Sequence, residues 1–278
     1  MLKQRVITAV VLLAILLPAL FAPVAWPFAV LTLVMIGAAG WEWARLNGVT
    51  GGGALALGFA LAAACAAAFA AGWVTEAPSA AWWIATLVWV LGGVWALRAG
   101  PAGWPALSKV LRCALGLVAL WTAWLALANA KAIGVNFILS IFCLVWAADI
   151  AAYFGGKTFG RRKLAPAISP GKSWEGVWSG MLGVLVLALL WLWIDRSFAM
   201  DSQSLYGRLS GRLRYAGLAL GVVFLAAMSV VGDLVESLAK RSAGAKDSSG
   251  LLPGHGGVLD RIDALLPVFP LALALSSI

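Results

Sequence analysis

Acidic, hydroxyl and basic residues near the end of the chain recur at a spacing that indicates one helix face. Four of them follow one another at i, i+3, i+4 and i+7, which places them on the same side of a helix. These four residues are Asp233, Glu236, Ser237 and Lys240. Asp260 and Asp263 lie three residues apart and would also share a face. The segment therefore predicts two acidic helix ends that are joined by a loop.

The types of these residues favour phosphate and metal chemistry. Carboxylate oxygens without histidine or cysteine partners suit a hard cation, above all Mg²⁺, which completes its shell with water and substrate phosphates. Lysine and arginine can neutralise phosphate, and glycine lets backbone N–H groups approach it closely. The residues placed to do so are Lys240, Arg241, Lys246, Arg261, Gly254, Gly256 and Gly257. The alternative interpretation, a solvated loop with charged helix ends, stays open at this point.

An earlier segment is also rich in glycine and lysine. Gly156-Lys157-Thr158 and Gly171-Lys172-Ser173 are similar to the end of a P-loop. A P-loop needs another glycine five residues earlier, where this chain has Ala151 and Pro166, so neither piece qualifies. We expect short, flexible, cationic turns here. Asp149 lies nearby, and helix packing remains an alternative role for it.

The remainder of the chain predicts a membrane protein that positions these two segments. Of 278 residues, 63% are hydrophobic and only 11% are charged, too few to cover a soluble globule. Apolar runs of about 20 residues recur without alternation, which favours an all-α, polytopic helical protein over a β-barrel. A net charge of +9 fits loops that orient such a protein better than nucleic-acid binding. Three cysteines without CxxC spacing and a single histidine exclude a zinc site or histidine cluster within one chain.

We expect about nine spans, the first of them an uncleaved helix. Their approximate ranges are 6–22, 26–41, 54–74, 81–97, 113–130, 136–154, 176–194, 215–235 and 262–278. With a cytoplasmic N-terminus, 15 of the 20 lysines and arginines would lie on the cytoplasmic side. Residues 1–135 then form N-terminal transmembrane helices. Residues 136–278 form a catalytic region with cytoplasmic loops 155–175 and 236–263.

Residues 237–263 resemble a known signature. The matching pieces are Ser237-Leu238-Ala239-Lys240-Arg241, Leu252-Pro253-Gly254-His255-Gly256-Gly257 and Asp260-Arg261-Ile262-Asp263. It is that of the phosphatidate cytidylyltransferases, also called CDP-diacylglycerol synthases. The pieces at 153–156, 169–176 and 232–237 are similar to that family as well. Ala239 departs from it, since members tend to carry a larger apolar residue there, which affects packing more than chemistry.

The resemblance implies transfer of a cytidylyl group from CTP to phosphatidate with Mg²⁺, and a second, monovalent cation is not excluded. It implies Asp233 and Asp260 as metal ligands. The catalytic residues that follow are Asp233, Lys240, Arg241, Lys246, Asp247, His255, Asp260, Arg261 and Asp263. The substrate-binding residues are Tyr153, Gly156, Ser169, Lys172, Ser173, Glu236, Ser237, Gly254, Gly256 and Gly257. For His255 a loop-fixing hydrogen bond is an equal alternative, and Asp263 would orient Arg261 or support the metal ligands.

The resemblance also implies a multi-pass protein of the bacterial inner membrane, with CTP, phosphatidate and membrane lipids as partners and no nucleic acid. Tryptophan-rich faces are compatible with a homodimer. One alternative is a CTP-dependent lipid or polyprenol kinase, which would transfer the terminal phosphate. Another is an anion transporter, but its polar residues should line the middle of several helices rather than gather in two loops. A scaffold protein would require both loops to be inert.

Overall fold

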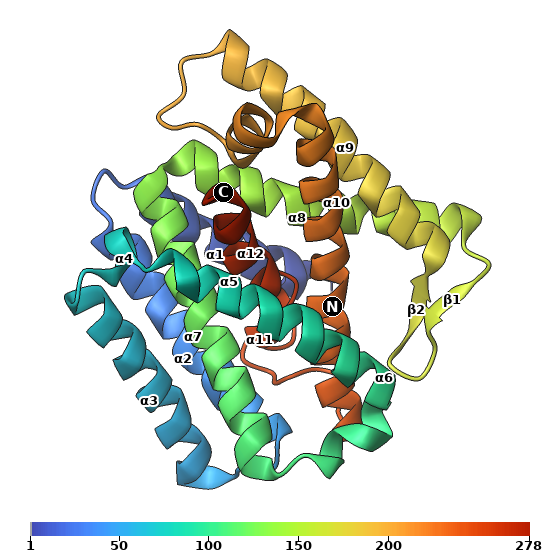
Figure 1. The fold of residues 1–278 in the computed structure, drawn as a ribbon. Coiled ribbons are helices and arrows are strands. Elements are labelled where there is room, and N and C mark those ends of the chain that lie inside the picture. The colour runs from blue at the N-terminus through green and yellow to red at the C-terminus, as the bar shows by residue number, and fades with distance from the viewer. Residues whose placement is uncertain (1) are drawn as a thin grey trace.

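The computed structural model describes residues 2–278 as a bundle of helices with one small β-hairpin (Figure 1). The helices are α1 (Leu2–Phe21), α2 (Trp26–Leu46), α3 (Gly51–Ala70), α4 (Trp73–Glu76), α5 (Ser79–Leu87), α6 (Gly93–Gly103), α7 (Lys109–Ile133), α8 (Val135–Phe159), α9 (Trp174–Ser197), α10 (Leu205–Ser242), α11 (Leu259–Ile262) and α12 (Leu265–Ser276). A π-helical turn, Val88–Gly92, joins α5 to α6, and a short 3₁₀ turn, Trp104–Ala106, follows α6. The hairpin strands are β1 (Lys163–Ala165) and β2 (Ser169–Ser173).

Within residues 2–278, seven helical segments are long and apolar enough to cross a membrane. They are Trp26–Leu46, Gly51–Ala70, Ser79–Ala106, Lys109–Ile133, Val135–Phe159, Trp174–Ser197 and Leu205–Ser242. The prediction of a polytopic helical membrane protein is therefore confirmed. Each of the nine predicted ranges coincides with helix. The helices at the first and last ranges are not among the seven that are long and apolar enough to cross a membrane.

The last helix lies inside the bundle. Nearly every residue of α12 is buried, and the helix packs against α5, α7, α8 and α10 (Figure 1). Phe269 is 1% exposed and meets Phe142 of α8 edge to face, with ring centroids 5.1 Å apart. Neighbouring helices, not lipid, therefore enclose this hydrophobic segment. Its burial fixes α11 and the preceding loop against α10.

The longest side-by-side contact joins α8 to α9 and depends on small residues. A Cβ on Gly176 would lie 2.9 Å from the Ala152 carbonyl oxygen, and one on Gly180 would lie 2.9 Å from that of Ala148. Only glycine permits this approach without displacing the partner backbone. The close contact brings the end of α8 beside the start of α9, where the loop 155–175 was predicted.

That loop contains a short β-hairpin that the sequence did not indicate, within an otherwise helical fold. β1 and β2 pair antiparallel, with Lys163 opposite Ser173. Glu175 holds the base of the hairpin, since its carboxylate accepts the N–H groups of Arg161 and Arg162. Ser173 caps α9 by accepting the Gly176 N–H at 3.2 Å. Residues Gly171 to Ser173 are therefore held in a strand that leads directly into α9.

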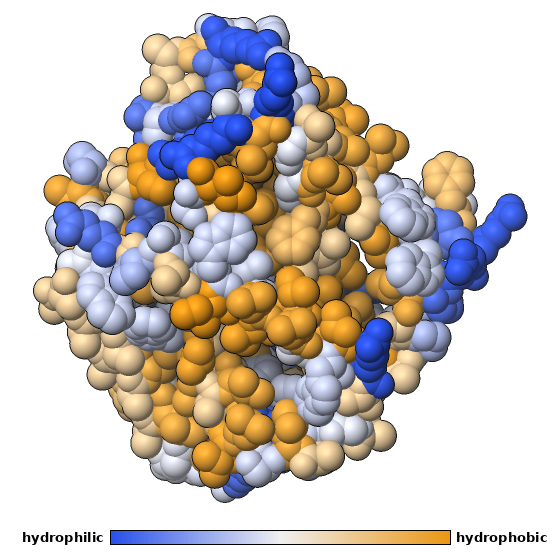
Figure 2. Space-filling view, in the orientation of Figure 1, coloured by the Kyte–Doolittle hydropathy of each residue, from blue (hydrophilic) through white to orange (hydrophobic). Residues whose placement is uncertain are grey.

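The surface separates into an apolar belt and polar ends. In Figure 2 hydrophobic residues cover the middle of the visible face, and hydrophilic residues gather near the α9–α10 connection and near the hairpin. Large apolar side chains such as Phe59, Leu91 and Leu220 are well exposed, as expected for a surface that faces lipid. α10 breaks at Arg214, whose φ of 59° is rare for a residue with a side chain.

Candidate active site

The second half of α10 carries the side chains whose spacing predicted one helix face. Lys240 Nζ lies 2.6 Å from Glu236 Oε2, one turn earlier. The Ser237 hydroxyl donates to Asp233 Oδ1 at 3.2 Å. These two contacts confirm the predicted shared face. Lys240 Nζ also lies 2.6 Å from Asp260 Oδ1, so one ammonium group joins α10 to α11.

Asp260 ties the glycine-rich loop to this pair of helices. Its Oδ2 accepts the Ser248 N–H at 2.9 Å, the Ser248 hydroxyl at 2.9 Å and the Gly257 N–H at 2.7 Å. Burial raises the pKa of this carboxyl group, but the Lys240 ammonium and the Gly257 and Ser248 N–H groups outweigh burial and hold the pKa at about 2. Asp260 is therefore ionised at neutral pH and anchors both ends of the loop.

Glu42 of α2, which no motif or spacing in the sequence indicated, reaches the same loop from the N-terminal region. Its side chain is fully buried. Oε1 accepts the Val258 N–H at 3.0 Å and the Ser249 hydroxyl at 2.5 Å. Oε2 accepts the Leu259 N–H at 2.7 Å and the Ser248 hydroxyl at 3.2 Å. The available signal was an acidic residue in an apolar segment, because ionisable groups at membrane depth are usually functional.

A cavity of about 490 Å³ opens beside Asp233, bounded by α8, β2, α9 and α10. Lys172 of β2 lies in its wall and pairs with Asp233, with Nζ 2.7 Å from Oδ2. The predicted substrate-binding residues that line this cavity are Tyr153, Gly156, Ser169, Lys172 and Ser173. Asp149 and Lys157 line it as well. The structure thus brings the earlier predicted loop and the first acidic residue of the later one to a single cavity.

The two predicted metal ligands hold different cations in the structure. Asp233 pairs with Lys172, and Asp260 pairs with Lys240. Glu236 Oε1, near the second pair, is buried without a hydrogen-bond partner among the described residues. No three histidine, cysteine, aspartate or glutamate side chains gather as a metal site in residues 2–278. Lysine ammonium groups occupy both carboxylates here, and Asp260 Oδ2 also accepts the Ser248 and Gly257 N–H groups. A hard divalent cation that takes its other ligands from water and phosphate would therefore have to displace Lys172 from Asp233.

The remaining predicted residues surround this network. Those that are exposed are Arg241, Lys246, Asp247, Gly254 and Arg261. Asp263 accepts the Ala264 N–H at 2.8 Å, and no ion pair joins it to Arg261 in the described part of the chain. His255 Nδ1 is buried and has no hydrogen-bond partner there either. Gly256, which follows His255, has a φ of 85° that favours glycine and helps close the turn of this loop.

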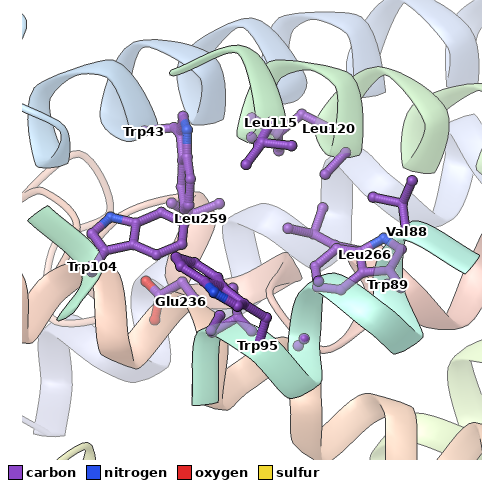
Figure 3. Close-up of a pocket in the computed structure, with 17 residues that line it drawn as sticks. Trp43, Val88, Trp89, Trp95, Trp104, Leu115, Leu120, Glu236, Leu259 and Leu266 are labelled. Carbon is purple, nitrogen blue, oxygen red and sulfur yellow. The ribbon is translucent and has the colours of Figure 1, made fainter. Parts of the chain in front are cut away.

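An apolar cavity of about 110 Å³ lies against another face of α10. Figure 3 shows its wall of tryptophan, leucine and valine side chains, with the Glu236 carboxylate beside Trp95 and Trp104. Glu236 is 2% exposed and has an aromatic, apolar environment on this side. Lys240 contacts this carboxyl group, and a buried carboxylate without such a cation would be costly.

Comparison with known proteins shows the family of the chain. A model of the cytidylyltransferase family matches residues 3–278. The chain belongs to the cytidylyltransferase family. A phosphatidate cytidylyltransferase of Pseudomonas aeruginosa is 41% identical over 99% of the chain and 97% of its own length. Two further phosphatidate cytidylyltransferases match part of it. The Haemophilus influenzae protein is 48% identical over 49% of this chain and 44% of its own, and the Bacillus subtilis protein is 40% identical over 51% and 48%.

Proposed function

We propose that this member of the cytidylyltransferase family transfers the cytidylyl group of CTP to phosphatidate, giving CDP-diacylglycerol and pyrophosphate for phospholipid synthesis. The observation that carries the proposal is the 41% identity to a phosphatidate cytidylyltransferase across 99% of the chain. That similarity spans both the cavity beside Asp233 and the network around Lys240, not the signature alone. The membrane-spanning helices suit a substrate that lies in a bilayer.

The chemistry requires positioning and charge compensation more than acid–base catalysis. A phosphate oxygen of phosphatidate forms a bond to the α-phosphorus of CTP, and the bond from that phosphorus to the bridging oxygen of pyrophosphate breaks. The attacking phosphate is already an anion near pH 7, so it needs no strong base. Two polyanions must approach, and charge grows on the departing pyrophosphate. Preorganised cations and backbone donors meet both needs.

The residues of the cavity and the loop divide these tasks. Lys172 and Lys157, in the cavity wall, would bind phosphate oxygens, and Asp233 would orient Lys172 before substrate arrives. Asp233 and Asp260 would hold Mg²⁺ together with the substrate phosphates. When bound, Mg²⁺ acts as a Lewis acid and template for the transferred phosphate. Lys240 would keep Asp260 and Glu236 in place while the metal and CTP bind.

The membrane placement follows from the charge distribution. We infer a cytoplasmic N-terminus and α1 as a further crossing, with both charged segments at the cytoplasmic end of the bundle. A site there is open to CTP from the cytoplasm and to phosphatidate from the side. Neighbouring helices shield its irregular backbone from lipid. The same reasoning favours the inner membrane of a bacterium.

Two radioactive labels on CTP test the proposed reaction against the lipid-kinase alternative. With purified protein, phosphatidate and Mg²⁺, a label on the α-phosphate is expected to enter the lipid, and a label on the γ-phosphate to appear in pyrophosphate. EDTA in excess over Mg²⁺ should abolish transfer, and added Mg²⁺ should restore it. Transfer of the γ-label to lipid would instead establish a kinase. Activity that persists in EDTA would contradict the metal assignment.

A further inference from the structure

We infer that Glu42 is a positioning residue for the reaction: it holds the 248–259 loop so that Asp260 and Lys240 stay in place. The inference rests on the proposed function, because it assigns a role within that same site. Glu42 lies on α2, more than 200 residues before the loop it binds. It contributes no atom to the cavity beside Asp233. Its influence on the reaction must therefore pass through the loop.

The Glu42 carboxylate accepts hydrogen bonds from the start of α11. A helix start leaves N–H groups without partners inside the helix, and here the Val258 and Leu259 N–H groups donate to the two Glu42 oxygens at 3.0 and 2.7 Å. One buried side chain therefore replaces the cap that the local sequence does not supply, since Val258 has no capping side chain.

Ser248 connects Glu42 to the ion pair of Asp260 and Lys240. Its hydroxyl lies 3.2 Å from Glu42 Oε2 and 2.9 Å from Asp260 Oδ2, and its N–H donates to Asp260 as well. Gly257 lies against both Ser248 and Glu42, and only a residue without a side chain fits there, because a Cβ would collide with Ser248 Oγ and Glu42 Oε1. The glycine of the signature is therefore required by the approach of Glu42. A shift of the loop would move Asp260 and, through their contact, the Lys240 ammonium.

Glu42→Gln is the sharpest test because it keeps the size of the side chain. Each Glu42 oxygen accepts one peptide N–H, so an amide NH₂ in either orientation would face one of them, donor against donor. We expect kcat for cytidylyl transfer to fall by about 10–100-fold, as for a loss of positioning. We also expect trypsin to cleave faster after the exposed Lys246 in the loop.

Thr32→Val is the matched control. Thr32 is another buried polar residue of α2, it accepts the Trp124 Nε1–H at 3.2 Å, and its contacts do not include the loop. It should lower the thermal midpoint by an amount comparable to Glu42→Gln, with kcat and cleavage at Lys246 unchanged. Equal losses of kcat in both variants would overturn the inference, as would wild-type kcat and cleavage in Glu42→Gln.

Failure of the Glu42→Gln protein to accumulate and inactivity of the wild-type protein are interpreted separately. If Glu42→Gln does not accumulate in membranes, Ser249→Ala carries the test, since it removes one donor to Glu42 and leaves Asp260 untouched. The same changes in kcat and cleavage, in smaller degree, are then expected, and their absence overturns the inference. If the wild-type protein makes no CDP-diacylglycerol, the proposed function fails, whereas faster cleavage at Lys246 in Glu42→Gln would still support the loop-holding role.

Discussion

Asp233→Asn is expected to lower kcat for CDP-diacylglycerol formation by about 10²–10³-fold while the protein still folds. Asparagine keeps the shape of the side chain and the contact with Ser237, but removes the charge that pairs with Lys172 and would bind Mg²⁺. Loss of one preorganised electrostatic group in a site of this kind has an effect of that size. The measurement is kcat of purified variant and wild type over a range of Mg²⁺ concentrations.

The control for this substitution is Glu76→Gln. Glu76 is an exposed carboxylate at the end of the short helix α4, away from the cavity residues, so its neutralisation should leave kcat unchanged. A wild-type rate for Asp233→Asn at every Mg²⁺ concentration would remove Asp233 from the metal site. A higher Mg²⁺ requirement in the variant would support the assignment.

Lys240→Met is expected to have the largest effect on stability. The Lys240 ammonium compensates two carboxylates, Glu236 and Asp260, whose side chains are 2% and 4% exposed. Methionine fills a similar volume, but leaves both charges without a cation. Breaking a buried pair in this way costs about 3–5 kcal/mol, because an uncompensated buried charge remains. Unfolding in mixed micelles with increasing SDS measures the loss.

A double-mutant cycle separates this pairing from a general effect of the substitution. Glu236→Gln removes one of the two carboxylates, so the free energy lost in Lys240→Met should be smaller in that background. Lys163→Met, at the exposed first residue of β1, changes a lysine that forms no ion pair within residues 2–278 and should leave stability within about 0.5 kcal/mol. An equal loss in both backgrounds would show that Lys240 does not stabilise Glu236.

Local spacing accounts for the parts of the site that the sequence predicted. The contacts of Lys240 with Glu236 and of Ser237 with Asp233 join residues one helical turn apart, which a periodic pattern specifies directly. Hydrophobic runs located the long helices, because a run of apolar residues is also a local pattern. Glycine and lysine content indicated the earlier loop, and the resemblance assigned substrate binding to its residues. The structure places Tyr153 and Lys172 in one cavity with Asp233.

Contacts between distant segments account for what the sequence did not reveal. Glu42 meets its partners across more than 200 residues, and no local pattern links them. The hairpin was missed because strands β1 and β2 have only 3 and 5 residues and carry lysine, glycine and proline rather than alternating apolar side chains. The enclosure of α12 by other helices also depends on distant contacts, which hydropathy alone does not register.

Filling the cavity beside Asp233 tests most directly that the reaction takes place there. Gly171 lines the cavity, and a Cβ at this position meets no atom within 4 Å, so Gly171→Leu adds bulk at the cavity wall from a Cβ position that is free of contacts. Gly52→Leu is the control, since Gly52 at the start of α3 has equally open surroundings and does not line the cavity. We predict that kcat/KM for CTP and phosphatidate falls at least about tenfold in Gly171→Leu, equivalent to about 1.4 kcal/mol, with thermal midpoints unchanged in both. Wild-type kcat/KM in Gly171→Leu would contradict the assignment of the cavity as the active site.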